Sequence, residues 1–278
     1  MRYFLAFLIF SCATSAHAQN LSIDLYGGAM NYQGDLQDSR YTFSQSHFAG
    51  GFGLSYALSD HFSVRGSLLV GKVSADDKYG RNKARNLNFS SSITEGQLAL
   101  QYFITPVGDH FITPYLFGAI AVYHFNPYTF DSNGVKTYLR PLSSEGQGFV
   151  PGKNVYKLTQ ASLPFGGGIK LSLSDNINVG LELGLRKLFT DYLDDVSTTY
   201  VDESTLLANR GPKAVALAYR GDELKSGLPY PAGGSIRGGA KNKDWYYFTG
   251  ITLSFKLGNG GGTSGRRNKQ YGCPVNVR

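Results

Sequence analysis

After its first ten residues the sequence has no apolar run of the roughly 18 residues that a membrane-spanning helix needs. A helical membrane protein is therefore excluded. Charged residues are also scarce, at 17%, and the 10 prolines contrast with 35 glycines and an aromatic content of 14%. This bias favours β structure with tight packing, which a membrane barrel and a soluble β-sandwich would share.

Cysteine is nearly absent, with Cys12 and Cys273 as its two occurrences. Residues 1–18 carry Arg2, an apolar run and the small residues Ala16 and Ala18, a pattern typical of a cleaved secretory signal. Cleavage leaves Cys273 alone in an oxidising compartment, so that it is either a free thiol or bonded to another chain. A lipoprotein signal ending at Cys12 is the disfavoured alternative, because Phe10 is bulky for such a site.

Acidic residues are missing from residues 258–278, which are rich in glycine and contain Arg266, Arg267, Lys269 and Arg278. The composition predicts a flexible basic tail. Because an exported protein rarely meets nucleic acid, we expect the tail to contact an acidic partner or to be a solvated end.

Eight segments alternate apolar and polar or small residues with period two, as strands do. Long and short connections alternate strictly between them. This rhythm predicts an eight-stranded antiparallel up-and-down transmembrane β-barrel over residues 19–257, with outer-membrane lipid around it, short periplasmic turns, long extracellular loops and both termini in the periplasm. The predicted strands are residues 21–31, 48–58, 62–73, 90–104, 112–125, 165–173, 177–189 and 244–257.

The strand at 244–257 places Trp245 at the outer rim and Leu257 at the periplasmic rim. For the strand at 112–125 we predict that one set of side chains points outward to lipid. That set is Tyr115, Phe117, Ala119, Ala121 and Tyr123.

A barrel of eight strands is just wide enough for side chains to fill its interior. The inward positions hold charges of both signs, and buried charges require partners. We therefore predict a structural network of paired charges in the lumen, with a narrow proton or ion path as the alternative. Its predicted members are Asp24, Arg65, Glu95, Lys170, Glu182, Arg186 and Lys256.

Catalytic and metal signals are weak. His47 and His124 fall near the outer rim, but no serine or carboxylate partner has a recognisable spacing, so neither enzymatic activity nor a cofactor is expected. The acidic run at residues 191–195 lacks the glycine and distal glutamate of an EF-hand calcium loop. We expect these carboxylates to be solvated or paired with Arg210, Arg220 or Arg237.

Three stretches, residues 27–36, 189–202 and 244–258, resemble the PorG-type outer-membrane barrels of Bacteroidetes. The most specific part is Asp191-Tyr192-Leu193-Asp194-Asp195-Val196-Ser197.

The resemblance implies a non-enzymatic part of the type IX protein secretion and gliding motility machinery, associated with a periplasmic ring of a PorK-like lipoprotein and a PorN-like protein. Arg266, Arg267, Lys269 and Cys273 are then the expected contact residues, with an intermolecular disulfide at Cys273 as one route. The alternative is a surface-exposed barrel whose long loops bind a ligand, a protein or a surface.

Overall fold

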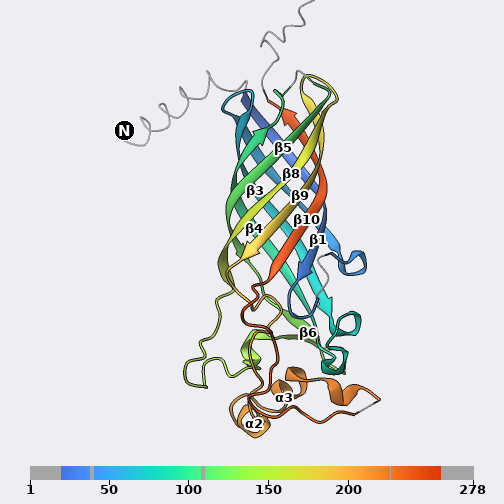
Figure 1. Ribbon diagram of the computed structural model, residues 1–278, viewed down its shortest axis with the longest axis vertical. Helices are drawn as coiled ribbons and strands as arrows, with labels where there is room; N and C mark the ends of the chain where they lie inside the picture. Colours follow the sequence, from blue (N-terminus) through green and yellow to red (C-terminus); the bar gives the residue numbers. More distant parts are fainter. Residues whose placement is uncertain (1–19, 38–40, 108–109, 226, 258–278) are drawn as a thin grey trace, which may run out of the picture.

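The computed structural model describes residues 20–37, 41–107, 110–225 and 227–257. Eight long strands form a barrel (Figure 1). Each coincides, to within six residues at its ends, with a segment in which the sequence alternates. The strands are β1 Leu21–Gln33, β2 His47–Ala57, β3 Phe62–Asp76, β4 Asn88–Phe103, β5 Ile112–His124, β8 Thr159–Ser172, β9 Ile177–Leu188 and β10 Trp245–Lys256.

The barrel is closed and antiparallel throughout. Its strands follow the order β3-β2-β1-β10-β9-β8-β5-β4, and β3 also pairs with β4. The first and last strands are neighbours, with Ser22 opposite Lys256 and Gln33 opposite Trp245. Closure leaves no open sheet edge, which is the condition for a sheet to cross lipid. The predicted eight-stranded antiparallel barrel is thus confirmed.

The outer wall of the barrel is apolar, as lipid contact demands. Aromatic pairs flank this belt, with Phe62 and Tyr102 near the short turns and Phe165 and Trp245 towards the long loops. This arrangement makes the barrel one of the outer-membrane type. The exposed belt includes Leu25, Phe52, Leu54, Leu68, Leu98, Leu100, Leu116, Ile120, Val122, Leu181, Leu183 and Ile251.

The predicted facing of β5 is wrong. The structure turns Tyr115, Phe117, Ala119, Ala121 and Tyr123 inward. Leu116, Ile120 and Val122 form the outer face instead. Because both faces are apolar, alternation alone cannot orient this strand. Pairing with β4 decides it, since Tyr123 lies opposite Glu95 and Phe117 opposite Gln101, both of which are buried in the lumen.

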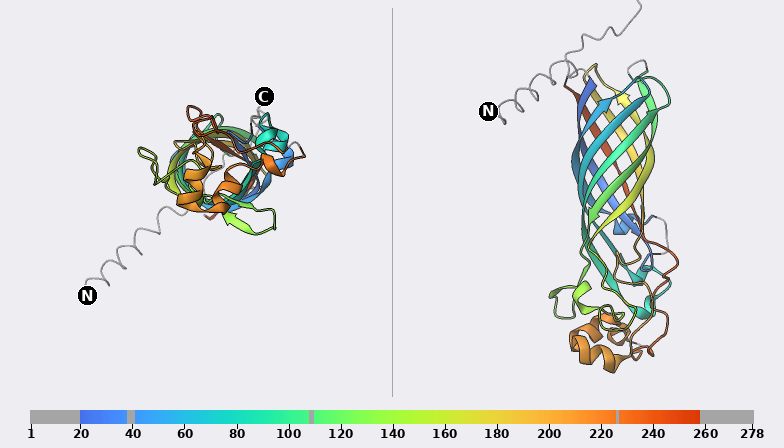
Figure 2. Two further views of the ribbon diagram at one scale, coloured as in Figure 1. Left: turned by 90° about the horizontal axis from the view of Figure 1, so that it is seen from below. Right: turned by 90° about the vertical axis from the view of Figure 1, so that its left-hand side faces the viewer.

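The long connections fold into a cap at the end of the barrel opposite the short turns (Figure 1; Figure 2). We use "cap" for the described residues of 34–46, 77–87, 125–158 and 189–244. It contains the hairpin β6 Tyr128–Phe130 and β7 Lys136–Tyr138 and the helices α2 Glu203–Arg210 and α3 Pro212–Ala218. Viewed along the barrel, the two helices overlie its mouth (Figure 2).

The two helices were not anticipated from the sequence, which was interpreted as loop at these positions. Asp202 caps α2 by accepting a hydrogen bond from the backbone N–H of Thr205 at 3.2 Å. Gly211, with φ +80°, then turns the chain, and Pro212 opens α3. Among the described residues, no helix is long and apolar enough to cross a membrane.

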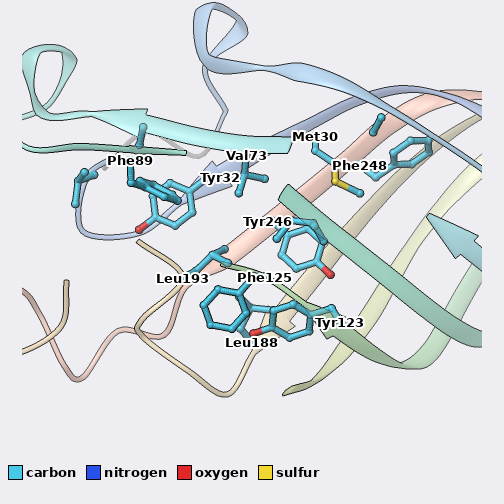
Figure 3. Packing of buried hydrophobic residues seen from close by; sticks show 14 of the residues in the cluster. Met30, Tyr32, Val73, Phe89, Tyr123, Phe125, Leu188, Leu193, Tyr246 and Phe248 are labelled. Atoms are coloured by element: carbon cyan, nitrogen blue, oxygen red, sulfur yellow. The ribbon is translucent and has the colours of Figure 1, made fainter. Parts of the chain in front are cut away.

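A buried apolar cluster joins the cap to the barrel mouth (Figure 3). Phe248 and Tyr246 come from β10, Phe125 follows β5, and Leu193 comes from the acidic run. Tyr32 packs edge-on against Phe89, with ring centroids 4.9 Å apart. The cap is therefore continuous with the barrel core and is fixed upon it.

Candidate functional site

The lumen holds two buried Arg–Glu pairs among the residues predicted to lie there. Arg65, from β3, reaches across to Glu182, from β9, with Nη1 to Oε2 at 2.6 Å and Nη2 to Oε1 at 3.1 Å. The Tyr115 hydroxyl donates to the same carboxylate at 2.7 Å. The Arg65 guanidinium also lies 5.1 Å from the centre of the Phe117 ring, so it is covered as well as paired.

The second pair lies nearer the cap. Arg186 Nη2 is 3.2 Å from Glu95 Oε1, and both side chains are completely buried. The Tyr246 hydroxyl also hydrogen-bonds Glu95. Each carboxylate in the middle of the lumen thus meets an arginine and a tyrosine.

The other three predicted lumenal charges are placed differently. Asp24 accepts hydrogen bonds from Ser55 and Ser254. The Lys170 ammonium lies 5.0 Å from the centre of the Phe103 ring. Lys256 ends β10, opposite Ser22. Hydrogen bonds and ion pairs therefore join four of the seven residues into two Arg–Glu pairs, and Asp24, Lys170 and Lys256 contact other groups.

The predicted partner-binding residues Arg266, Arg267, Lys269 and Cys273 lie outside the described residues, as does the predicted signal at 1–18. The rim histidines are described. His47 Nε2 lies 2.6 Å from Ser74 Oγ, and His124 Nδ1 lies 2.9 Å from Thr159 Oγ1. Within the described part of the chain, no group of three or more His, Cys, Asp or Glu side chains is arranged to hold a metal ion.

The acidic run folds into the cap interior, which contradicts the expectation of solvated carboxylates. Asp191, Asp194 and Asp195 are all buried. Of the three arginines expected to pair with them, Arg237 approaches most closely, but it donates to the backbone carbonyl of Asp195, at 2.6 Å. Arg220 pairs instead with Glu223. Arg210 lies 3.5 Å from the backbone carbonyl of Gln147.

Three side chains from distant parts of the sequence meet where the cap joins the barrel. The Tyr32 hydroxyl, at the end of β1, lies 2.6 Å from Asp194 Oδ2 and 3.0 Å from Asp244 Oδ1. We call Tyr32, Asp194 and Asp244 the carboxyl latch. A hydroxyl donates one proton, so satisfying both contacts requires one carboxyl to be protonated and to donate to the tyrosine oxygen.

The surroundings of the latch favour that extra proton. Burial, with the nearby charge of Asp35, raises the pKa of Asp194 well above its ordinary range. Burial and the charge of Asp194 do the same to the pKa of Asp244. Arg85 opposes the shift at Asp194, but its guanidinium is already paired with Asp77 at 2.7 Å.

Backbone groups hold the latch in place. Asp244 Oδ2 accepts from the Leu193 N–H at 2.9 Å, and Asp194 Oδ1 accepts from the Val196 N–H at 2.9 Å. A Cβ atom on Gly34 would overlap both the Tyr32 hydroxyl and the Asp244 carboxylate. Glycine at this position is therefore a steric requirement of the latch.

A second buried centre orders the rest of the cap around Glu145. Its carboxylate receives the backbone N–H groups of Ser197 and Thr198, at 2.8 and 2.9 Å, and pairs with Arg237 at 3.0 Å. Asp195, held at φ +65°, accepts from the hydroxyls of Ser144 and Tyr156, each at 2.8 Å. These contacts tie the loop after β5 to the acidic run.

Sequence reasoning missed Tyr32, Glu145 and Asp244 as site residues, although Tyr32 and Asp244 lie within the stretches that resemble a known family. The local signal for Asp244 is its place immediately before the aromatic start of β10. Nothing in the spacing of Glu145 marks it, because its partners lie about fifty or more positions away.

The cap also has a cleft on its surface, with a volume of about 530 Å³. Both charges and tyrosines contribute to its walls, so that it offers hydrogen-bonding and apolar contacts together. The residues lining it include Asp35, Arg81, Asn82, Arg85, Tyr200, Tyr219, Ile236 and Arg237.

Several solved structures are similar to this chain at low identity. Neisserial surface protein A is 7% identical, covering 85% of this chain and 96% of its own, with a TM-score of 0.42. Ail of Yersinia pestis, in complex with the heparin analogue sucrose octasulfate, is 10% identical, with coverages of 85% and 98% and a TM-score of 0.40. OprG of Pseudomonas aeruginosa is 11% identical, with coverages of 85% and 97% and a TM-score of 0.40.

These likenesses say nothing of what this chain binds. No curated protein matches the sequence. A family model does match, over residues 1–208, which is most of the chain. The chain therefore belongs to the family described as Domain of unknown function (DUF6089).

Proposed function

We propose that this chain is a sealed, non-enzymatic outer-membrane barrel that anchors a periplasmic assembly, the type IX secretion and gliding machinery. Its proposed partners are a PorK-like lipoprotein and a PorN-like ring protein. The observation that carries the sealed part of the proposal is the pair of Arg–Glu bridges buried across the lumen.

Opening a path through this barrel would require those bridges to separate. Arg65 and Glu182, like Arg186 and Glu95, are almost wholly buried, and an unpaired buried charge costs several kcal/mol. The cap covers the mouth in addition (Figure 2). A barrel of this kind acts through its surfaces, which favours an anchor over a pore.

The orientation of the barrel makes the tail the anchoring element in this proposal. Leu21 and Leu257 are hydrogen-bonded to each other at the end where the short turns lie, with Leu257 N to Leu21 O at 2.8 Å. Short turns face the periplasm in barrels of this type. Residues 258–278 would then begin in the periplasm, where Arg266, Arg267, Lys269 and Cys273 could reach a partner.

The resemblance of residues 27–36 and 189–202 to PorG-type barrels supplies the identity of the assembly. Deleting residues 259–278 should abolish type IX secretion while leaving the folded barrel in the membrane. Cys273→Ser should do the same if the contact is covalent, and Ser264→Ala is its matched control within the tail. Normal secretion by both the deletion and Cys273→Ser would contradict the anchor.

A non-reducing gel of the native membrane tests the covalent route separately. The expected result is a band of higher mass that disappears on reduction and in Cys273→Ser. Persistence of the band in Cys273→Ser would assign it to another protein. Replacing Arg266, Arg267 and Lys269 together by Ala tests the charge contribution while the thiol is retained.

The cleft in the cap favours a second function, in which the loops bind a ligand, a protein or a surface. Ile236, which lines the cleft, is strongly exposed and adds an apolar contact to its charged and aromatic walls. Ile236→Arg with an intact tail should impair attachment of cells to a surface and leave secretion unchanged. The opposite pattern, with secretion lost, would count against this function.

A further inference from the structure

The connection between β1 and β2 projects sideways from the barrel wall at the end that carries the cap (Figure 1). The described residues of this connection include the 3-10 turn Phe43–Gln45. Phe43, at the tip of this turn, is 87% exposed, and Phe48, at the start of β2, is 79% exposed. Two aromatic rings thus stand clear of the protein on one side.

The turn is held rigidly. Asn31 of β1 is completely buried, and its Nδ2 donates to the backbone carbonyl of Thr42 at 2.7 Å and to Ser46 Oγ at 3.1 Å. Ser46 Oγ donates in turn to the Thr42 carbonyl at 3.1 Å. A buried strand residue therefore fixes where Phe43 is presented.

The chemistry of the segment is that of a membrane interface. Tyr41 packs edge-on against Phe43, with ring centroids 5.1 Å apart, and tyrosine combines an apolar ring with a polar tip. Residues 41–48 contain no Asp, Glu, Lys or Arg, and the residues between the aromatics are Ser, Thr, Gln and His. Such a segment can place rings among acyl chains and hydroxyls among headgroups.

The position of residues 41–48 next to the lipid-facing outer wall indicates that their partner is lipid. Phe48 lies on the outward face of β2, in line with Phe52 and Leu54 of the lipid-facing belt. Phe43, which is 87% exposed, belongs to the connection that leads into this strand and projects sideways from the barrel wall (Figure 1).

We propose that residues 41–48 form an aromatic foot that inserts into the boundary between headgroups and acyl chains of the leaflet at the cap end. The partner is lipid. The foot fixes the depth of the barrel in the membrane independently of the strands and holds the cap close to the membrane surface.

Fluorescence quenching by lipid tests this directly, because Trp245 is the only tryptophan in the chain. In a Trp245→Phe background, Phe43→Trp in the full chain is reconstituted into phosphatidylcholine vesicles whose acyl chains are brominated either near the headgroup or near the terminal methyl. We expect several-fold stronger quenching by the shallow bromines than by the deep ones. Retention of the heat-sensitive mobility of folded barrels on gels confirms that each variant is folded.

The matched control is Tyr138→Trp in the same background, on the exposed hairpin strand β7 of the cap, where we expect little quenching. Absence of quenching at position 43 overturns the proposal. Equal quenching at 43 and 138 also overturns it, because the whole cap would then contact lipid. Quenching at 43 that weakens as the protein-to-lipid ratio rises would assign the aromatic foot to a second copy of the chain.

Discussion

The lumen and the carboxyl latch both bury carboxylates, but they neutralise them in different ways. In the lumen Glu182 and Glu95 each face an arginine, Arg65 and Arg186. In the carboxyl latch Asp194 and Asp244 face the Tyr32 hydroxyl and backbone N–H groups instead. Charge is cancelled by opposite charge in the lumen, as it also is at Glu145 and Arg237 in the cap, and by a shared proton in the latch.

The difference gives the two regions different sensitivities. An ion pair is insensitive to pH while both partners stay ionised, and breaking it requires that two charges be separated in a dry interior. A shared proton is lost to alkali without any change in sequence. The lumen is thus built to stay closed, whereas the attachment of the cap depends on pH.

The largest effect is expected from unpairing a lumenal charge. Arg65→Leu leaves Glu182 buried with the Tyr115 hydroxyl as its remaining partner and should lower the free energy of unfolding by about 3–5 kcal/mol. Urea unfolding in lipid vesicles measures it. The double variant Arg65→Leu, Glu182→Leu should recover much of the loss, and the exposed Lys136→Leu on β7 should change little. If Arg65→Leu left the free energy of unfolding unchanged, the proposed contrast between the ion pairs of the lumen and the shared proton of the latch would be wrong.

A smaller and local effect is expected at the carboxyl latch. Tyr32→Phe removes the hydroxyl that joins Asp194 to Asp244 and should lower the local stability of the cap by about 1–3 kcal/mol, with the barrel intact. Hydrogen exchange at the Leu193 and Val196 amides measures this local opening. Tyr79→Phe, at an exposed tyrosine, is the control. Faster exchange in the strands as well would show that cap and barrel unfold together.

The barrel was accessible from the sequence because lipid imposes a rule on each strand. One face must be apolar, so Leu25 and Asp24 on neighbouring positions already assign outside and inside. The rule fails where both faces are apolar. For this reason the predicted facing of β5 is wrong. Its true facing depends on which side of β4 carries Glu95 and Gln101, which is information from another strand.

The cap was not accessible in this way. Tyr32 meets Asp194 and Asp244 across separations of 162 and 212 residues, and no local period links them. The acidic run predicts carboxylates that are solvated or paired with arginines, because nothing in the local sequence indicates that it is buried. Aspartates are stable when exposed to water, and they are also stable when buried with hydrogen-bond donors around them. The sequence around 191–197 does not show which of these two environments applies.

The pH dependence of the cap should follow from its raised acid pKa values. Burial raises the pKa of Asp191 to about 7, and it also raises the pKa values of Asp194 and Asp244 well above their ordinary range. Stability from these groups is therefore present below their unfolded pKa of about 4 and is lost as pH rises through the folded values. The other charges acting on them are Asp35, Glu145, Lys243 and Arg85, which is paired with Asp77.

Hydrogen exchange of cap amides, corrected for its intrinsic pH dependence, should therefore show protection falling from pH 5 to pH 8. Amides of β3 and β9 around Arg65 and Glu182 serve as the internal control and should keep their protection. Asp194→Asn should flatten the response of the cap. If the hydrogen-exchange protection of the cap amides rose with pH, the proposed shared proton of the carboxyl latch would be contradicted.

The smallest effect concerns an exposed carboxylate inside the cap region. Hydrogen bonds from the Ser204 hydroxyl and the Thr205 backbone N–H lower the pKa of Asp202, which caps α2. Its contribution has the opposite sign to that of the latch. It is present above the ordinary aspartate pKa of about 4 and is lost as pH falls through the lowered folded value.

Asp202→Ala should speed hydrogen exchange of the amides at the start of α2 at pH 7, with the exposed Lys157→Ala as control. If exchange at α2 instead became faster at high pH, together with exchange at the latch, the cap would respond to pH as one unit. The difference in pH dependence would then separate the barrel from the cap and would not separate carboxylates within the cap.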